Sequence, residues 1–157
     1  MDITCGIFLY DAVNKTILAT RSYGSRKFEK LSIPKGMFDE DLDKDYIEGA
    51  FREFREETSV DLIKLFNNGE DITDNSNFFN LGFSQYSTKT KKLNAFLLIS
   101  KNDLSDLVLI CESFFKSDGK EFPEISEYYW LTLDEAKERL HETQSILIPK
   151  IIKIVTQ

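Results

Sequence analysis

Apolar residues in this chain gather in short runs bounded by turn-forming residues, and most of these runs have the length of β-strands. Strands are predicted over residues 3–11, 16–21, 78–87, 93–100 and 127–131. The first two runs flank a turn-prone segment and the next two flank the basic turn 88–92, so each pair is predicted to form a hairpin. Pro34 disfavours helix at Ile33, so the stretch 30–36 is predicted to be extended.

One segment has the 3.6-residue period of an amphipathic helix. The helix is predicted to begin at Asp45, a candidate N-cap whose capping box is completed by Glu48, and to run to about residue 58. Its apolar side falls within an arc of about 100° and should face the core. This side is formed by Ile47, Ala50, Phe51, Phe54 and Thr58.

Two further helices are predicted towards the C-terminal end. Thr132 and Glu135 form a second capping box that opens a helix over 133–140, and the apolar segment 146–155 is predicted to be helical, with Pro149 near its start or at a kink. No element is assigned to residues 60–77 or 101–121. Because there is no repeat, low-complexity segment or linker, residues 1–157 are predicted to form one α/β domain with a mixed sheet between helices.

Composition and charge narrow the classes of function. The net charge is −7, and the segment 35–57 alone carries nine acidic and four basic residues, which argues against a broad basic surface for nucleic acid. Cys5 and Cys111 are far apart and His141 is the only histidine, so zinc, haem and Ser-His-Asp chemistry are poorly supplied. No apolar run approaches the ~20 residues of a membrane span, and residues 1–11 do not have the pattern of a signal peptide. A cytoplasmic protein without a membrane partner is therefore expected.

The acidic side of the helix 45–58 is a candidate cation site. Glu53 and Glu56 are spaced i, i+3 and Glu53 and Glu57 are spaced i, i+4, so three carboxylates share one face and repel one another by a few tenths of a kcal/mol per pair. A bound Mg²⁺ or Mn²⁺ would offset this repulsion, as would Arg52 in part. Gly49 lies on the same arc and is interpreted as leaving the backbone open for a bulky ligand. The alternative is a solvated, charged helix face.

The sequence around this helix resembles the Nudix box. The segment 34–60 reads PKGMFDEDLDKDYIEGAFREFREETSV, with Gly36 at the place of the leading glycine of the box. The second half of the box is matched in register by Arg52, Glu53, Phe54, Arg55, Glu56, Glu57 and Val60. The segments 18–24 and 124–136 also resemble those of family members that act on dinucleoside polyphosphates, so the resemblance covers roughly residues 3–142.

Three positions depart from the family pattern. Gly36 precedes Arg52 by 16 residues, two more than in the pattern. Lys44 stands where the pattern has its spaced glutamate, with Asp43 and Asp45 beside it. Ser59 replaces the glycine that follows the glutamate pair, which implies backbone strain if this residue has a positive φ.

The resemblance implies an α/β/α sandwich and a hydrolase that cleaves a nucleoside diphosphate linked to another moiety, with Mg²⁺ or Mn²⁺ as cofactor. The implied metal ligands are Gly36, Glu53, Glu56 and Glu57. The expected catalytic residues are Glu53 and Glu56 together with Glu124, a candidate general base from a later loop, and Arg52 is expected to orient the glutamates.

Substrate contacts are predicted less specifically. Lys35 is the first candidate to bind phosphate, and Arg21 and Lys27 are weaker candidates. Aromatic residues of the predicted strands are candidates to line a base pocket, although such residues are more often in the core. These are Tyr86, Phe96, Tyr128 and Tyr129.

Several functions stay open at this point. The substrate is a dinucleoside polyphosphate, ADP-ribose or a related dinucleotide, or an RNA 5′ end that would bind near the basic turn 88–92. The alternatives are a Nudix-fold module that binds a nucleotide without cleaving it, favoured by Lys44 and Ser59, and an acidic helix that contacts proteins. The oligomeric state is left open between monomer and homodimer.

Overall fold

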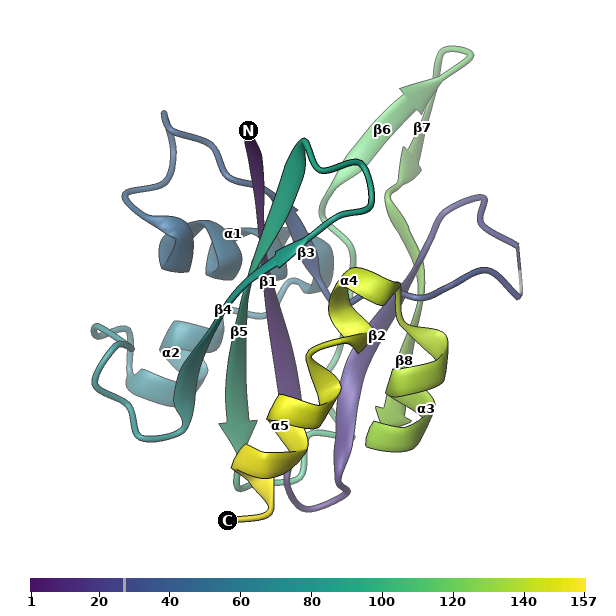
Figure 1. Cartoon of the computed structure of the whole chain (residues 1–157). Helices are drawn as coiled ribbons and strands as arrows, with labels where there is room; N and C mark the ends of the chain where they lie inside the picture. Colours follow the sequence, from purple (N-terminus) through teal and green to yellow (C-terminus); the bar gives the residue numbers. More distant parts are fainter. Residues whose placement is uncertain (27) are drawn as a thin grey trace.

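A mixed β-sheet forms the centre of the molecule in the computed structural model, which describes residues 1–26 and 28–157 (Figure 1). Its strands follow the order β4-β5-β1-β2-β8, and β3 pairs with β1. The strands are β1 (Asp2–Asp11), β2 (Thr16–Ser22), β3 (Lys35–Met37), β4 (Phe78–Gln85), β5 (Lys91–Ser100) and β8 (Ile125–Thr132). Strands β1 and β5 run parallel, whereas the other pairs are antiparallel.

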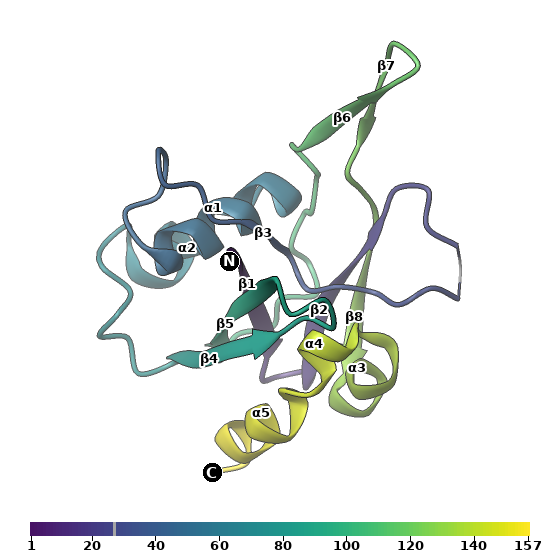
Figure 2. The same ribbon diagram turned by 45° about the horizontal axis from the view of Figure 1, so that its top comes forward.

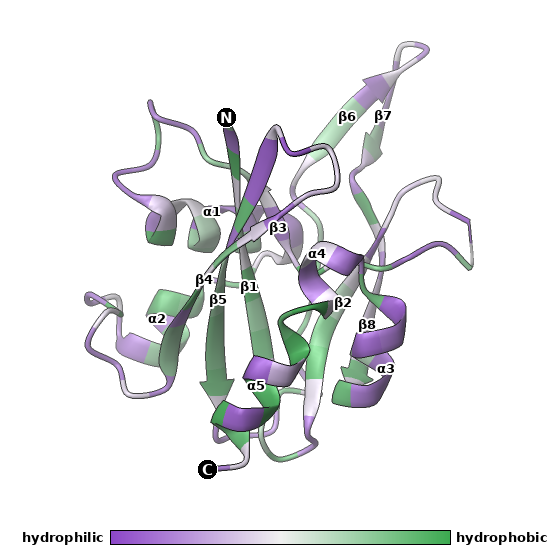
Figure 3. Ribbon diagram, viewed as in Figure 1, coloured by the Kyte–Doolittle hydropathy of each residue, from purple (hydrophilic) through white to green (hydrophobic). Residues whose placement is uncertain are grey.

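Helices cover both faces of this sheet (Figure 2). One face is covered by α1 (Tyr46–Thr58) and α2 (Leu62–Asn67), and the other by α3 (Leu133–Arg139), α4 (Glu142–Ser145) and α5 (Ile148–Val155). Side chains alternate along a strand, so β1 sends Ile7 and Leu9 to the first face and Phe8 and Tyr10 to the second. Strands β1 and β5 are accordingly hydrophobic along most of their length (Figure 3). The predicted α/β/α sandwich is confirmed.

The sheet divides around β1, and this division creates the space for a site. Only the end of β1 pairs with β2, at Tyr10–Ile17 and Asp11–Thr16, while its beginning pairs with β3. Strand β2 therefore diverges from β1, and the bridge Thr20–Ser32 spans the opening. Gly6 allows the close approach of β3, because a Cβ at this position would lie 2.8 Å from the Cβ of Lys35.

The predicted helices are confirmed with one difference at a helix start. The Asp45 side chain accepts from the N–H of Glu48 at 2.9 Å, but the Glu48 side chain accepts from Lys44 rather than from Asp45, so the first capping box is not closed. The second box, at Thr132, is closed, and Pro149 lies in the first turn of α5, where its missing N–H is harmless.

Two elements occur in segments that the sequence pattern left unassigned. One is α2, and the other is a hairpin of β6 (Phe114–Ser117) and β7 (Lys120–Pro123), which projects from the body of the molecule (Figures 1 and 2). Within the part of the chain that is described, no helix is long and apolar enough to cross a membrane.

Candidate active site

Helix α1 presents three glutamates to the opening beside β3. The helix is held in this position because the Asp45 cap fixes its start and because its opposite side is buried through Ala50, Phe51 and Phe54. The side chains of Glu53 and Glu56 are 14% and 37% exposed, whereas Glu57 is buried at 6% exposure for the whole residue. The glutamates thus range from accessible to enclosed along less than two turns of helix.

The carboxylate of Glu53 lies directly against the backbone of β3. A Cβ added to Gly36 would be 2.0 Å from Glu53 Oε2 and 2.1 Å from its Cδ, so a side chain at residue 36 would displace the Glu53 carboxylate. Gly36 therefore allows this close approach, which brings Glu53 and the backbone of residue 36 to one place.

Arg52 organises the glutamates. Its Nη1 donates to Glu53 Oε1 at 3.0 Å and to Glu56 Oε2 at 3.1 Å, while its Nε and Nη2 donate to the two oxygens of Asp43 at 2.7 and 2.9 Å. The Asp43 side chain is fully buried. Burial would raise the pKa of Asp43, but the hydrogen bonds from Arg52 and from the Asp39 N–H lower it. This fixed ion pair holds the guanidinium in place between the glutamates.

The electrostatics of the glutamates reflect their burial. Burial raises the pKa of Glu57 to about 8; nearby Lys35 opposes the shift, and Glu53 and Glu124 add to it. Burial also raises the pKa of Glu53, opposed by Arg52. The N–H of Lys35 lies 3.4 Å from Glu57 Oε1. Closely spaced carboxylates with raised pKa values attract either protons or cations, which is the electrostatic character of a cation site.

A cavity of about 430 Å³ encloses this cluster. It is lined by Thr20, Ser22, Ser32, Lys35, Gly36, Met37, Glu53, Glu56, Glu57, Ser113, Glu124 and Ile125. The residues come from both sides of the divided sheet, from α1 and from the base of the β6–β7 hairpin. Glu124, predicted from the sequence as a later acid of the site, is thus brought to the same cavity as the three glutamates of α1.

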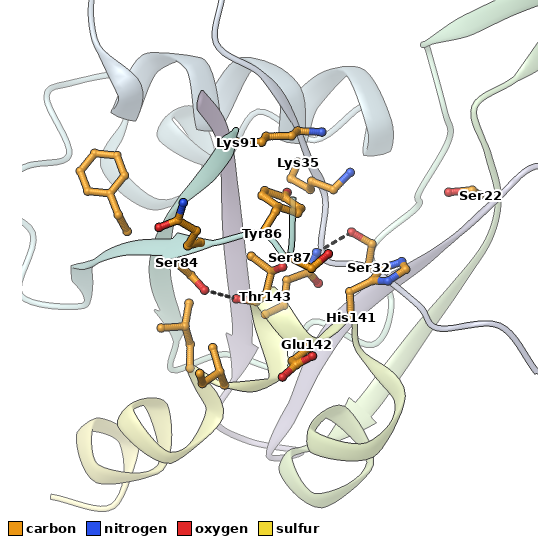
Figure 4. A pocket seen from close by; sticks show the side chains of 15 residues that line it. Ser22, Ser32, Lys35, Ser84, Tyr86, Ser87, Lys91, His141, Glu142 and Thr143 are labelled. Atoms are coloured by element: carbon orange, nitrogen blue, oxygen red, sulfur yellow. Dashed lines mark hydrogen bonds between the residues drawn. The ribbon is translucent and has the colours of Figure 1, made fainter. Parts of the chain in front are cut away.

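A larger cavity of about 890 Å³ adjoins the first, because Ser22, Ser32 and Lys35 line both. Figure 4 shows Tyr86, Lys91 and His141 around this space, together with a hydrogen bond from Ser84 to the carbonyl of Thr143. Burial lowers the pKa of His141, and nearby Lys35 and Lys30 act in the same direction. His141 is exposed at the start of α4, and the packing of α4 against β4 brings it to the rim of this cavity.

Of the residues predicted to contact substrate, some line the cavities and others do not. Lys35 lines both cavities. Arg21 is buried and donates to Tyr129 Oη at 3.3 Å, and neither residue is among the described residues that line the two cavities. Their contact with substrate stays a prediction. Lys27 lies outside the described residues.

The candidate base-pocket aromatics also separate. Tyr86 lines the larger cavity. Phe96 is fully buried and stacks on Phe78 at 5.5 Å between ring centroids. Tyr128 donates to the carbonyl of Glu57 at 2.5 Å and so fixes the end of α1. Phe96 and Tyr128 thus have structural contacts, whereas Tyr86 is hydrogen-bonded to Thr4 and also lines the larger cavity.

A family model of the NUDIX domain matches residues 2–151. The chain belongs to the Nudix family. The prediction of a Nudix-type hydrolase acting on pyrophosphate bonds is confirmed at the level of the family. A comparison with curated proteins found no match.

Solved structures share the Nudix fold at low sequence identity. An Ap4A hydrolase of C. elegans in a binary complex has a TM-score of 0.60 and 16% identity, with 98% of each chain covered. The dihydroneopterin triphosphate pyrophosphohydrolase of E. coli has a TM-score of 0.66 and 14% identity, with 97% of this chain and 95% of the other covered. A bifunctional NMN adenylyltransferase/ADP ribose pyrophosphatase of Francisella tularensis, complexed with AMP and a Mn ion, has a TM-score of 0.65 and 14% identity, with 98% and 42% covered.

The structure accounts for the departures from the Nudix pattern. Asp43, not Lys44, supplies the carboxylate in the loop before α1, since its side chain holds Arg52 from within the core. Ser59 has φ of 66° in the left-handed region, a conformation that a glycine adopts without strain. The lengthened loop is thus compatible with an ordered Arg52.

One interpretation from the sequence is wrong. Gly49 does not leave room for a ligand, because a Cβ there would lie 3.1 Å from Asp43 Oδ2 and 3.3 Å from Phe38 Cδ1. Glycine at this position accommodates the loop 38–43, and so serves the Asp43–Arg52 pair rather than a bound molecule.

The donor set suits a hard divalent cation. Carboxylate oxygens of Glu53, Glu56 and Glu57 and a backbone carbonyl at Gly36 are the ligand types that Mg²⁺ and Mn²⁺ prefer. No three His, Cys, Asp or Glu side chains of the described residues converge at metal-ligand distances, and Arg52 donates hydrogen bonds to both Glu53 and Glu56. The residues fit the cation by chemistry and by the close approach at Gly36.

Proposed function

We propose that this protein is a Mg²⁺- or Mn²⁺-dependent pyrophosphohydrolase that cleaves a nucleoside diphosphate linked to another moiety. The observation that carries the proposal is that one cavity gathers the three glutamates of α1, Gly36, Lys35 and Glu124. Acidic groups alone would repel a phosphate chain, so a bridging cation is a necessary part of the proposal.

Glu53, Glu56, Glu57 and the Gly36 carbonyl would hold the cation. When bound, it would neutralise phosphate oxygens and lower the pKa of a water molecule. Arg52 keeps Glu53 and Glu56 oriented through its own pairing with Asp43, which limits the freedom of two ligands before substrate arrives. Lys35, which lines both cavities, would bind a phosphate oxygen where the two spaces meet.

A general base must take a proton from the attacking water. Glu124 and Glu53 are the candidates, because both line the glutamate cavity. Glu124 is exposed and comes from the opposite wall of the cavity, so it would approach the water from the side away from α1. Glu53 is partly engaged by Arg52, and we therefore favour Glu124 for the proton transfer.

The two adjoining cavities support a substrate with a phosphate chain and a sizeable further group. Lys35, Ser22 and Ser32 join the 430 Å³ space to the 890 Å³ space, which is large enough for a nucleoside. The proposed substrates are therefore dinucleoside polyphosphates, ADP-ribose and related dinucleotides, in keeping with the ligands named for the structurally similar proteins.

An RNA 5′ end is a second candidate because of one observation. Lys91, the first residue of β5, lines the larger cavity, and its Nζ lies 4.9 Å from the ring centroid of Tyr86. This lysine would form an ion pair with the phosphate that follows the first nucleotide of an RNA.

The proposal predicts that Glu56→Gln lowers Mg²⁺-dependent turnover on the order of 100-fold, because it removes a charged ligand while keeping the shape of the side chain. A panel of dinucleoside polyphosphates, ADP-ribose and 5′-triphosphorylated RNA should be used, with products identified after hydrolysis in isotopically labelled water to show which phosphorus is attacked. Glu40→Gln, at an exposed acid of the preceding loop, is the charge-matched control. If the wild type binds a nucleotide but hydrolyses none of these compounds, the proposed enzymatic function is wrong and the protein is a nucleotide-binding module.

A further inference from the structure

The β6–β7 hairpin carries an aromatic cluster that the proposed chemistry does not use. The hairpin forms a two-stranded sheet of its own and extends away from the central sheet (Figures 1 and 2). An isolated two-stranded hairpin has little stability by itself, so the aromatic residues stabilise it in part. Their exposure, however, is more than this structural role needs.

Three rings form the cluster. Tyr23, from the loop after β2, stacks on Phe122 of β7 with centroids 4.8 Å apart and an angle of 27°, and Phe115 of β6 lies 6.0 Å from Tyr23 and 5.9 Å from Phe122. Tyr23 is 43% exposed and Phe115 is 37% exposed. Tyr23 and Phe115 are therefore partly open to solvent.

Strand register places this cluster next to the glutamate cavity. Phe115 pairs with Phe122, and the next backbone contact inward joins Ser113 to Glu124, whose N–H donates to the Ser113 carbonyl at 2.8 Å. Ser113 and Glu124 lie just outside the two strands, at the base of the hairpin, and each is two residues along the chain from a ring of the cluster, Phe115 or Phe122. Ser113 and Glu124 line the cavity.

The third ring, that of Tyr23, is also close in the chain to residues that line the cavity. The N–H of Tyr23 donates to the carbonyl of Glu124 at 2.8 Å, and Ser22, its chain neighbour, also lines the cavity. Two residues of strand span about 7 Å. The backbone of the three aromatic residues thus lies within about two residues, roughly 7 Å, of residues that line the glutamate cavity.

We propose that Tyr23, Phe115 and Phe122 form a stacking platform for a nucleobase of the substrate. Stacking on aromatic rings suits a base because it needs an exposed ring face and no fixed hydrogen-bond pattern. The inference rests on the proposed function, and it narrows the substrate class. The glutamate cavity adjoins the platform and also the 890 Å³ cavity, so the preferred substrate has bulky groups at both ends of its phosphate chain, as a dinucleoside polyphosphate does.

The test measures binding of a methylene-bridged, non-hydrolysable analogue of diadenosine tetraphosphate by calorimetry in the presence of Mg²⁺. Phe115→Leu and Tyr23→Leu keep apolar bulk and remove the ring face, and each should weaken the affinity by about 5- to 50-fold. Phe114→Leu is the matched control, because Phe114 is 55% exposed in the same strand but points to its other face. This control should bind within about twofold of the wild type.

Three results would contradict the proposal that these rings stack on a nucleobase. The proposal is wrong if folded Phe115→Leu and Tyr23→Leu variants bind the analogue as tightly as the wild type. If Phe115→Leu disturbs the hairpin, the affinity of Tyr23→Leu is the deciding measurement, since Tyr23 lies outside the hairpin. A wild-type dimer that dissociates in Phe115→Leu with affinity unchanged would make the cluster an interface between chains. Hydrolysis of diadenosine tetraphosphate itself separates the two proposals: an unchanged KM in these variants rejects the platform alone, and binding without hydrolysis by the wild type rejects the enzymatic function alone.

Discussion

One residue at the end of α1, Ser59, combines a positive φ with a hydrogen bond to another segment. Ser59 adopts φ of 66° and donates its N–H to Arg55 O at 2.7 Å and its hydroxyl to Ile110 O at 2.6 Å. The serine thus combines an unfavourable backbone conformation with a contact that glycine lacks. The contact ties the helix to the segment that leads into the β6–β7 hairpin.

Substitution at this residue separates the two effects. Ser59→Ala loses the hydroxyl contact and keeps the positive φ, and we expect it to lower the free energy of unfolding by about 1 kcal/mol. Ser59→Gly loses the same contact but relieves about 1 kcal/mol of backbone strain, so it should remain within about 0.5 kcal/mol of the wild type. Urea denaturation measures both values. Equal stabilities of the alanine and glycine variants would contradict the account.

At the scale of elements, the loop before α1 and the helix form one unit. The loop buries Asp43 beneath Gly49, and Asp43 in turn holds Arg52, which reaches Glu53 and Glu56. The order of the glutamates therefore depends on a residue outside the helix, through contacts that local sequence patterns do not describe.

This dependence gives a second prediction. Asp43→Ala leaves Arg52 without its buried partner and should lower the free energy of unfolding by about 2–4 kcal/mol, together with a loss of Mg²⁺-dependent activity. Lys44→Glu, which installs the glutamate of the family pattern at an exposed site, should leave the stability within about 0.5 kcal/mol. Thermal denaturation and the turnover assay measure these effects. If Lys44→Glu strongly stabilises the protein, residue 44 rather than Asp43 is the counterpart of the spaced glutamate in the family pattern.

The elements also show which features a sequence reveals. Helix α1, the central strands and the cluster of Glu53, Glu56 and Glu57 were predicted because periodicity and a short motif encode them locally. The role of Asp43 was missed because it depends on how a lengthened loop folds back, and that path has no periodicity. The β6–β7 hairpin was missed because its exposed strands lack the alternation of buried and polar residues. Gly49 was misread because a glycine signals close approach without saying what approaches.

At the scale of the whole molecule, packing against the sheet raises the proton affinity of the site. Glu57 is enclosed between α1 and the body of the protein, and its pKa rises to about 8 from an ordinary value of 4.5. Between these two values the folded protein binds a proton that the unfolded chain has released. Stability must therefore fall as the pH rises through this interval.

We expect the metal-free protein to lose stability from pH 5 to pH 8 with a slope approaching about 1.4 kcal/mol per pH unit. Glu57→Gln, which cannot ionise, should flatten most of this slope, and the remainder combines Glu53, whose pKa is raised in the same direction, with His141, whose lowered pKa acts in the opposite direction. Denaturation in buffers containing a chelator measures the effect. Added Mn²⁺ should stabilise the wild type most at the high end of the range, because ligand carboxylates bind metal in the deprotonated form. A stability that rises with pH in the metal-free protein would contradict the assignment.

The division of the sheet around β1 also has a consequence for descent. The residues that border the opening, such as Thr20, Ser22 and Ser32, are set by the diverging paths of β2 and the segment before β3, while the glutamates stand on a helix anchored elsewhere. Changes along the border can alter what enters without disturbing the acids that act on it. In evolutionary terms, the fold thus allows the border of the opening to diverge between related chains while the carboxylates of α1 are kept.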